Sequence, residues 1–363
     1  MTLLFADGFE GYTTGGDKTV LDTVYDYHVT NPTHAGVAGT GRISGKCGFS
    51  LNGFYNPTIV FGHNLVLSTL SSSSTWIIGF AMKCDENFYG ANFQLVNPLV
   101  QFVESSLTLP SAAMLSVDIA GSTLNVVTGQ ANTGPKLCSG GRLLAKRWHY
   151  VELKVFFHAS TGTVELRVDG EVVGSGTGQT TAPDGIGDNT PTYVSIGGSV
   201  FSRRVLFDDF YVCDSAGSVN NTFLGDIGIR RLDTTADGTT NNFTPLAGTN
   251  WEAVDEDDPD GDDTYVESST VGHIDLYAID DAGVTPAAIN ALQVISTGKK
   301  DDASAKGGRN RLLSGASSAT GPTYALTTGY VPYQSLHETD PNTGVAWTEA
   351  GVDAVEVGVE VVS

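Results

Sequence analysis

The sequence predicts an all-β protein made of two domains. Much of the first 213 residues consists of short runs in which β-forming side chains alternate with polar ones, separated by turns rich in Gly, Asn, Pro and Ser. Helix-forming stretches of normal length are not evident in this region. At 363 residues the chain is about twice the usual domain size, so each half is long enough to bury its own core.

A change of composition places the domain boundary near residue 214. Residues 1–213 hold 12 basic and 17 acidic side chains, whereas residues 214–363 hold 7 and 24. Turn residues without apolar periodicity fill the segment 215–221. We therefore predict a β-sandwich over residues 1–214 and a smaller, acidic, β-rich domain over residues 215–363.

The clearest strands of the first domain lie between Trp148 and Val173. Within residues 148–157 and 163–168 most of the apolar side chains are spaced by two, so each run presents one apolar face. Asp169-Gly170 supplies the positive φ angles of a tight turn before the next run. This pattern predicts two antiparallel hairpins in series.

These strands resemble the last strands of a laminin-G-like or concanavalin A-like jelly roll, together with residues 193–198 and 207–212. In that family a closing strand with an Asp-Asp pair, here Asp208-Asp209, returns beside the first strand, here residues 3–10. The resemblance covers about 210 residues and implies a jelly-roll sandwich. The fold hosts lectins, glycosidases, adhesion modules and virion proteins, so it does not by itself name a function.

The second domain is predicted to be β-rich with one or two short helices. Thr285-Pro286 is typical of a helix cap followed by proline, which predicts one or two helical turns as far as Leu292. Thr348 is a further cap and predicts a short helix before the last strand. The predicted strands cover residues 227–232, 264–267, 273–279 and 357–362.

The second half resembles tail-associated and other minor virion proteins of double-stranded DNA bacteriophages. The resemblance is carried by Phe223-Leu224-Gly225-Asp226-Ile227, by an Asp-rich loop, by the segment 340–348 and by the Gly-Val-Glu-Val-Val ending. It implies a component of the particle without assigned chemistry, on either the head or the tail.

We find no enzyme motif in the sequence. Glycosidases of the jelly-roll fold carry Glu-x-Asp-x-x-Glu on one strand, and this pattern is absent. The Gly-x-Ser-x-Gly elbow of serine hydrolases is absent too, and the seven histidines stand singly, without zinc-ligand spacing. We therefore expect no enzymatic activity. A polysaccharide depolymerase is the alternative, because carboxylates from distant strands can converge in a groove.

The run from Asp255 to Asp263 is the sharpest chemical feature, with seven carboxylates in nine residues. Counted from Glu256, acids stand at positions 1, 3, 5 and 12 around Gly261 at position 6, which partly imitates a calcium loop. A solvated surface loop and a docking site for a basic partner are the alternatives. The candidate calcium ligands are Glu256, Asp258, Asp260, Asp262 and Glu267.

Four aromatic residues are candidates for glycan binding, since sugar rings stack on exposed aromatic faces. The alternative is that they are core or turn residues. They are Tyr55, Trp76, Phe88 and Tyr89.

Charge and leader patterns limit the partners and the location. A net charge of -22 repels nucleic acids and anionic lipid surfaces. We find no signal peptide or membrane anchor, so we expect assembly in a host cytoplasm and release by lysis. Reduced thiols are expected in a cytoplasm, although disulfides remain an alternative after release. The four cysteines are Cys47, Cys84, Cys138 and Cys213.

Together these observations predict a non-enzymatic bacteriophage virion structural protein on the exterior of the tail or head. It is expected to act through contacts with other virion subunits and to form a homo-oligomer. The alternative is a host-glycan-binding adhesion module of the virion. We expect no cofactor apart from the candidate calcium ion.

Overall fold

The computed structural model describes residues 2–12, 14, 21, 24–25, 35–43, 45–51, 62–84, 99–104, 113–120, 122–129, 134–181, 190–197, 204–283 and 285–363. Across these residues the protein is nearly all β, which confirms the predicted fold class. In this part of the chain no helix is long and apolar enough to cross a membrane.

The chain divides into two compact units, each with its own sheets. The first unit comprises residues 1–10 and 14–230, and the second comprises residues 11–13 and 231–363. The division therefore lies after Arg230 and not at residue 214 as the sequence suggested. Residues 215–230 belong to the first unit because their backbone is hydrogen-bonded to carboxylates of its strands.

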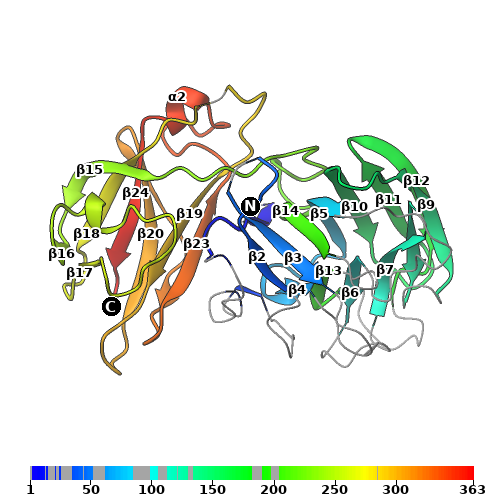
Figure 1. Cartoon of the computed structure of the whole chain (residues 1–363), viewed down its shortest axis with the longest axis horizontal. Helices are drawn as coiled ribbons and strands as arrows, with labels where there is room; N and C mark the ends of the chain where they lie inside the picture. The colour runs from blue at the N-terminus through cyan, green and yellow to red at the C-terminus, as the bar shows by residue number, and fades with distance from the viewer. Residues whose placement is uncertain are drawn as a thin grey trace. The chain divides into compact units, whose positions relative to one another are not determined.

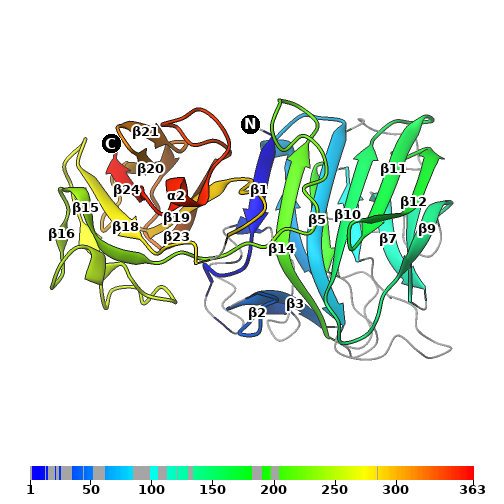
Figure 2. The same cartoon turned by 90° about the horizontal axis from the view of Figure 1, so that it is seen from above.

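The first unit is a sandwich of two antiparallel sheets, as predicted. The first sheet has the order β12-β11-β10-β5-β14-β3-β2, with β1 also paired to β14, and the second has the order β4-β13-β6-β7-β8-β9. Figure 2 shows β1, β14, β5, β10, β11 and β12 side by side in the first sheet. The first sheet comprises β1 (Leu3–Asp7), β2 (Ala35–Ala38), β3 (Cys47–Leu51), β5 (Thr75–Cys84), β10 (His149–Phe156), β11 (Gly162–Val168), β12 (Glu171–Gly178) and β14 (Arg204–Asp214). The second sheet comprises β4 (Gly62–Val66), β6 (Val100–Val103), β7 (Ala113–Ala120), β8 (Thr123–Thr128), β9 (Lys136–Arg142) and β13 (Tyr193–Gly197), and a short 3-10 helix, η1 (Leu67–Thr69), follows β4.

The predicted hairpins are confirmed in their register. Leu153 of β10 lies opposite Leu166 of β11, as the period-two pattern requires. The turn after β11 has φ 51° at Asp169 and 83° at Gly170, the left-handed angles that the Asp-Gly pair predicts. The closing strand β14 pairs with β1, so the expected return beside the first strand is confirmed.

Apolar side chains from both sheets fill the space between them. Phe102 of β6 meets Phe157, just after β10, at a centroid distance of 5.2 Å in an edge-to-face arrangement. Trp76 of β5 is 0% exposed and lies beside Val155 of β10. Burial of such large side chains is the main favourable contribution to the stability of the sandwich.

Glycines allow the edges of the two sheets to approach each other. A Cβ added to Gly176 of β12 would lie 2.2 Å from the backbone oxygen of Leu137 in β9, and one added to Gly140 of β9 would lie 1.8 Å from the oxygen of Val173. Backbone atoms cannot move aside as a flexible side chain can. The close approach of β9 and β12 therefore depends on glycine at these positions.

The second unit consists of one larger and two smaller antiparallel sheets among its described residues (Figure 1). Its largest sheet has the order β15-β18-β24-β20-β21, with β22 also paired to β20. These strands are β15 (Thr234–Asn241), β18 (Ile274–Ile279), β20 (Gly307–Ser314), β21 (Ser317–Thr320), β22 (Tyr324–Ala325) and β24 (Val355–Val361). Two further pairs are β16 (Thr244–Pro245) with β17 (Val266–Glu267), and β19 (Leu292–Gly298) with β23 (Val331–His337). The 3-10 helix η2 (Trp251–Ala253) and the helix α2 (Glu349–Val352) complete the unit.

Three local predictions for residues 215–363 had different outcomes. The helix after Thr348 is confirmed, and the Thr348 hydroxyl accepts the backbone N–H of Gly351 at 3.1 Å. The helical turns predicted over residues 285–292 were wrong, because Ile289 forms a β-bridge with Trp347 and keeps the chain extended into β19. The strand predicted over residues 227–232 was wrong as well, because Ile229 donates its N–H to a carboxylate and not to a neighbouring strand.

We predict that Gly176→Ala destabilises the first unit by about 1–3 kcal/mol, because the added methyl group has to push two backbones apart. The measurement is urea unfolding followed by fluorescence. Gly39→Ala is the control, since a Cβ there would make only an ordinary 3.6 Å contact with Thr14. Equal stability of the two variants would contradict the proposed backbone clash.

Candidate functional site

The second sheet has one face that is turned away from the apolar core. Phe102 of β6 contacts the first sheet, and its paired neighbour Leu115 of β7 shares that face. Side chains alternate along a strand, so the preceding residue of β6, Gln101, and the following residue of β7, Ser116, point to the opposite face. We call this side the outer face of the second sheet.

Three polar side chains form a row across the outer face. Gln101 lies in register with Ser195 of β13 on one side and with Ser116 on the other. The Gln101 amide Nε2 donates to the Ser116 hydroxyl at 3.3 Å, and that hydroxyl donates to the carbonyl of Gly129 at 2.6 Å. Each of the three polar residues is at most 4% exposed. Polar groups are thus held in fixed places on a face where a purely structural sheet could carry apolar ones.

A carboxylate stands two residues along from Ser116 on the same face. Asp118 of β7 lies opposite Asn125 of β8, whose amide Nδ2 donates to Asp118 Oδ1 at 2.7 Å. Asn125 in turn lies opposite Ser139 of β9, which is exposed to solvent. Ser116, Asp118 and Asn125 are all buried, at 0%, 3% and 5% exposure, whereas Ser139 at the β9 side is exposed.

This arrangement can bind hydroxyl groups and can hold one proton-transferring group. Amides and hydroxyls both donate and accept hydrogen bonds, as the hydroxyls of a saccharide do. A carboxylate fixed by a neighbouring amide is the type of group that transfers protons in general acid–base catalysis. The Asp118–Asn125 pair and the polar row together are our candidate site.

A second polar cluster lies on the opposite side of the first unit, on the outward face of the first sheet. Glu152 of β10 accepts the hydroxyl of Tyr211 of β14 at 2.6 Å and the N–H of Gly225 at 2.8 Å through the same oxygen, Oε1. Gly79 lies opposite Tyr211 and leaves room for its ring, since a Cβ there would lie 2.1 Å from the ring. The cluster therefore clamps residues 224–229 onto the first sheet.

Asp208 and Asp209 of β14 extend this clamp. Asp209 accepts the N–H of Ile229 at 2.7 Å and the Arg42 guanidinium at 2.8 Å, and Arg42 also contacts Asp226. Asp209 has a φ of 51° at a bulge in β14, which is unusual for a residue with a side chain. The described contacts of this cluster therefore attach residues 224–229 to the first sheet.

Burial sets the protonation of Asp208. Loss of hydration and the neighbouring charge of Asp209 raise the pKa of Asp208 to about 8, although the N–H groups of Arg42 and Asp209 donate to its two oxygens and act in the opposite direction. Burial raises the pKa of Asp209 as well, and the Ile229 N–H and Arg42 partly offset that rise. Asp208 is therefore largely protonated near neutral pH.

Of the four residues predicted to bind glycans, Trp76 is the one that the structure describes. Trp76 lies in the core with 0% exposure, so its ring offers no face to a sugar, and this corrects our expectation for it. The periodic pattern of β5 does not distinguish an inward from an outward tryptophan when both faces of a strand are buried. Tyr55, Phe88 and Tyr89 lie outside the described residues.

The acidic loop is held by basic and hydroxyl groups of the second unit. Lys299 and Tyr330 contact the carboxylate of Asp262, and Arg231 contacts the backbone carbonyls of Glu256 and Asp257. The Thr264 hydroxyl lies within hydrogen-bonding distance of both Glu256 and Asp260. Within the described ranges no three His, Cys, Asp or Glu side chains gather as metal ligands would. Calcium binding by Glu256, Asp258, Asp260, Asp262 and Glu267 stays a prediction, which calorimetry with calcium tests.

The described cysteines carry no disulfide. Cys47, Cys84, Cys138 and Cys213 are buried in the first unit. Burial raises the pKa of the Cys138 thiol, which disfavours the reactive thiolate.

Comparison with known proteins adds the following. No protein-family model matches the chain, and no curated protein matches it. Among solved structures, an endo-β-1,4-glucuronan lyase from the fungus Trichoderma reesei shares 14% identity at a TM-score of 0.41, covering 58% of this chain and 95% of the lyase. A carbohydrate esterase of the Shiga toxin-encoding bacteriophage phi24B shares 17% identity at a TM-score of 0.35, covering 58% and 97%. A GH131 β-glucanase catalytic domain from Podospora anserina shares 12% identity at a TM-score of 0.35, covering 61% and 99%.

These comparisons correct two expectations drawn from the sequence. The similar solved structures are a lyase, an esterase and a glucanase, whereas we expected a non-enzymatic virion structural protein, or else a host-glycan-binding adhesion module. The expectation of no enzymatic activity is therefore withdrawn. At these identities the likeness concerns the β-sandwich fold, and the reaction has to be argued from the residues of this chain.

The sequence reasoning missed Gln101, Ser116, Asp118 and Asn125. A signal was present in β7, where Ser116 and Asp118 interrupt an otherwise apolar strand at a spacing of two. Such spacing places both side chains on one face. We looked for acidic triplets on single strands, and a site assembled from several neighbouring strands does not produce that pattern.

We predict that the free energy of unfolding of the first unit falls as the pH rises from about 4 to about 8 through the contribution of Asp208. Its pKa is raised in the folded state, so the folded unit holds a proton that the unfolded chain releases near pH 4. Stability from this group is complete below that pH and is lost as the pH rises through about 8.

Urea unfolding at several pH values across this window measures the effect. The Asn side chain in Asp208→Asn cannot ionise, so the free energy of unfolding of this variant should change far less with pH. Glu171→Gln, at an exposed position of β12, should show the same fall with pH as the unmodified protein. Parallel pH profiles for the Asn variant and the unmodified protein would rule out Asp208 as the source.

Proposed function

We propose that this protein is a carbohydrate-processing enzyme whose first unit holds a saccharide on the outer face of the second sheet. The observation that supports the proposal is the set of hydrogen-bonding side chains placed on a single face by four neighbouring strands: Ser195, Gln101, Ser116, Asp118 and Asn125. Their fixed positions suit a ligand rich in hydroxyl groups.

Asp118 is the proton-transferring group in this proposal. Its Oδ1 accepts the amide of Asn125, which orients the carboxylate across the sheet. Breaking a glycosidic or ester bond needs a proton moved to or from an oxygen, and a positioned carboxylate accelerates such a step by roughly 10²–10⁴-fold. Asp118 and Asn125 are 3% and 5% exposed, so in this proposal a saccharide approaches the pair from the side of the exposed Ser139 on the adjacent strand.

The arrangement of polar residues also favours a chain-like substrate over an isolated sugar. Neighbouring strands lie roughly 4.8 Å apart, so the polar row crosses about 10 Å from β13 to β7, and the Asp118–Asn125 pair extends it toward β8. A saccharide lying across the strands meets a different polar side chain at each strand. We therefore propose a polysaccharide or oligosaccharide substrate.

We predict that the purified protein releases products from a polysaccharide and that Asp118→Asn lowers the turnover by roughly 10²-fold or more. The assay follows reducing ends for hydrolysis, ultraviolet absorbance of unsaturated uronides for elimination, and free acetate for ester cleavage. Asn at position 118 keeps the size of the side chain and removes the carboxylate, so substrate affinity should change far less than turnover.

Glu171→Gln is the matched control, because it removes one exposed carboxylate from the other sheet and should leave turnover unchanged. Absence of all three products across a broad polysaccharide panel would refute the proposal. So would an Asp118→Asn variant that retains full turnover.

We keep the particle location as a separate proposal from the sequence resemblance. A carbohydrate-processing protein carried on a bacteriophage particle would contact other virion subunits and could form a homo-oligomer. Co-sedimentation of the protein with purified particles tests this proposal, and recovery of the protein only in the soluble fraction would refute it.

A further inference from the structure

The second unit contains a pocket on the face of its largest sheet that is turned away from the unit's core. Leu312 of β20 is 0% exposed in that core, so the alternation along β20 places Arg309 and Arg311 on the opposite face. The pocket has a volume of about 690 Å³ when the open solvent at its mouth is included. It is lined by Val271, Gly272, Arg309, Thr323, Glu360, Val361, Val362 and Ser363.

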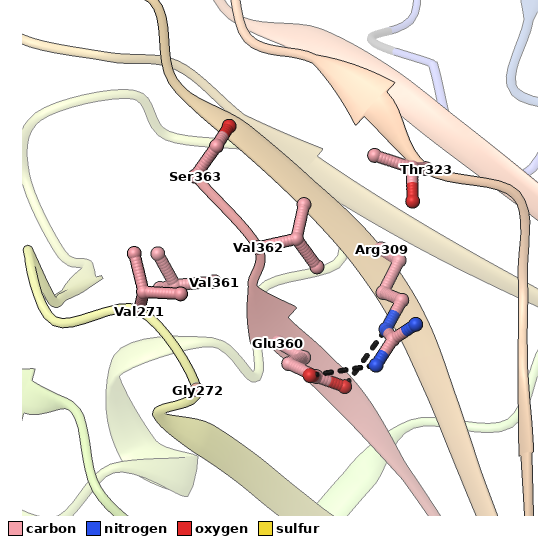
Figure 3. A pocket seen from close by; sticks show the side chains of 8 residues that line it. All are labelled: Val271, Gly272, Arg309, Thr323, Glu360, Val361, Val362 and Ser363. Carbon is pink, nitrogen blue, oxygen red and sulfur yellow. Dashed lines mark hydrogen bonds and ion pairs between the residues drawn. The ribbon is translucent and has the colours of Figure 1, made fainter.

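A planar ion pair forms the polar part of the pocket. Arg309 donates from Nε to Glu360 Oε2 at 2.8 Å and from Nη2 to Oε1 at 2.7 Å, so the two groups lie side-on in one plane (Figure 3). Arg311 also contacts Oε2, at 3.2 Å. The carboxylate is 11% exposed and the guanidinium side chain 32%, so both remain accessible.

The pair keeps unused hydrogen-bonding capacity toward the pocket. Nη1 of Arg309 carries two N–H donors and makes no hydrogen bond within the described part of the chain. Oε1 of Glu360 accepts one hydrogen bond and has a further lone pair. A donor and an acceptor are thus presented together on one rigid, planar group.

Apolar groups complete the pocket beside this pair. Val271 is 63% exposed, which is high for a valine, and Val361 and Val362 line the same pocket. Thr323 is exposed and adds a hydroxyl. A surface that combines valine side chains with a planar donor–acceptor pair matches a sugar ring, which has C–H groups on its faces and hydroxyls at its edge.

We propose that this pocket binds a neutral sugar residue through a vicinal diol. One hydroxyl of the diol donates to Glu360 Oε1, the neighbouring hydroxyl accepts from Arg309 Nη1, and the ring packs on Val271 and Val362. Glu360 neutralises Arg309, and Arg311 does not line the pocket, so the pocket offers an acidic sugar no uncompensated cation and the proposed ligand class is neutral. The choice of a saccharide rests on the proposed function, whereas the place of the pocket and its chemistry rest on the second unit alone.

The experiment is a titration of the whole chain with methyl glucoside, methyl galactoside and methyl mannoside, followed by NMR. Roughly millimolar affinity is expected for a site with so few hydrogen bonds. Glucuronic acid and a deoxy methyl glycoside that lacks one hydroxyl of the diol are the comparison ligands, and both should bind at least about three-fold more weakly. Failure of every neutral glycoside to bind, or preference for glucuronic acid, would overturn the proposal.

Variants connect the binding to the pocket residues. Arg309→Met should weaken binding by about ten-fold, because the donors at Nη1 are lost. Arg311→Met is the matched control, since Arg311 contacts the same carboxylate but does not line the pocket. Equal losses in the two variants would contradict direct contact by Arg309.

Two further measurements separate this proposal from a folding defect and from the catalytic proposal. Thr323→Val changes an exposed side chain without changing its shape, so it should fold normally and weaken binding about three-fold. Asp118→Asn should leave glycoside binding in the second unit intact while turnover is lost. Binding that disappears in Asp118→Asn but persists in Arg309→Met and Thr323→Val would place the sugar on the first unit and refute the pocket.

Discussion

The apolar layer between the two sheets of the first unit is the constraint on which the rest depends. Phe102 and Phe157 meet edge to face within it, and Trp76 is enclosed completely. Side chains alternate between the two faces along a strand, so burial of these side chains in the core directs the residues next to them in sequence to the opposite face. The placement of Gln101, Ser116 and Asp118 on the outer face is a direct consequence of that burial.

The two faces that point away from this core use their polar groups differently. On the first sheet, Glu152, Asp208 and Asp209 accept backbone N–H groups of nearby segments, although the second carboxylate oxygen of Glu152, Oε2, is buried without a described partner. On the second sheet, two described bonds of the candidate site run between side chains of adjacent strands, from Gln101 to Ser116 and from Asn125 to Asp118. Carboxylates that accept backbone N–H groups attach one segment of the chain to another. A face of mutually oriented amides, hydroxyls and a carboxylate is suited to a ligand. This difference is why we place the proposed chemistry on the second sheet although the first sheet holds more carboxylates.

In the second unit, basic side chains contact acidic groups at two separate places. Lys299 and Arg231 are directed into the acidic loop, where they contact Asp262 and the backbone of Glu256. Arg309 and Arg311 converge on Glu360 instead, and there two cations meet one carboxylate. The acidic loop is thereby held by contacts within the unit, while the Arg309–Glu360 pair keeps donors and an acceptor toward a pocket. The most acidic segment of the sequence is therefore not the segment with the most evident binding chemistry.

The sequence by itself determined the elements whose signals are local. The period of two in residues 148–168, the Asp-Gly turn at 169–170 and the Thr348 cap each depend on a few neighbouring residues, and each is confirmed.

Tertiary structure decided the rest. Thr285-Pro286 resembles a helix start, but the bridge between Ile289 and Trp347 extends the chain, and the partner is 58 residues away in sequence. Residues 227–232 resemble a strand in sequence, but the N–H of Ile229 donates to the Asp209 carboxylate and not to a neighbouring strand. The candidate site likewise joins β13, β6, β7 and β8, and only strand pairing brings Ser195 beside Gln101. Long-range pairing competes with local preference, and no short pattern in the sequence records which of the two prevails.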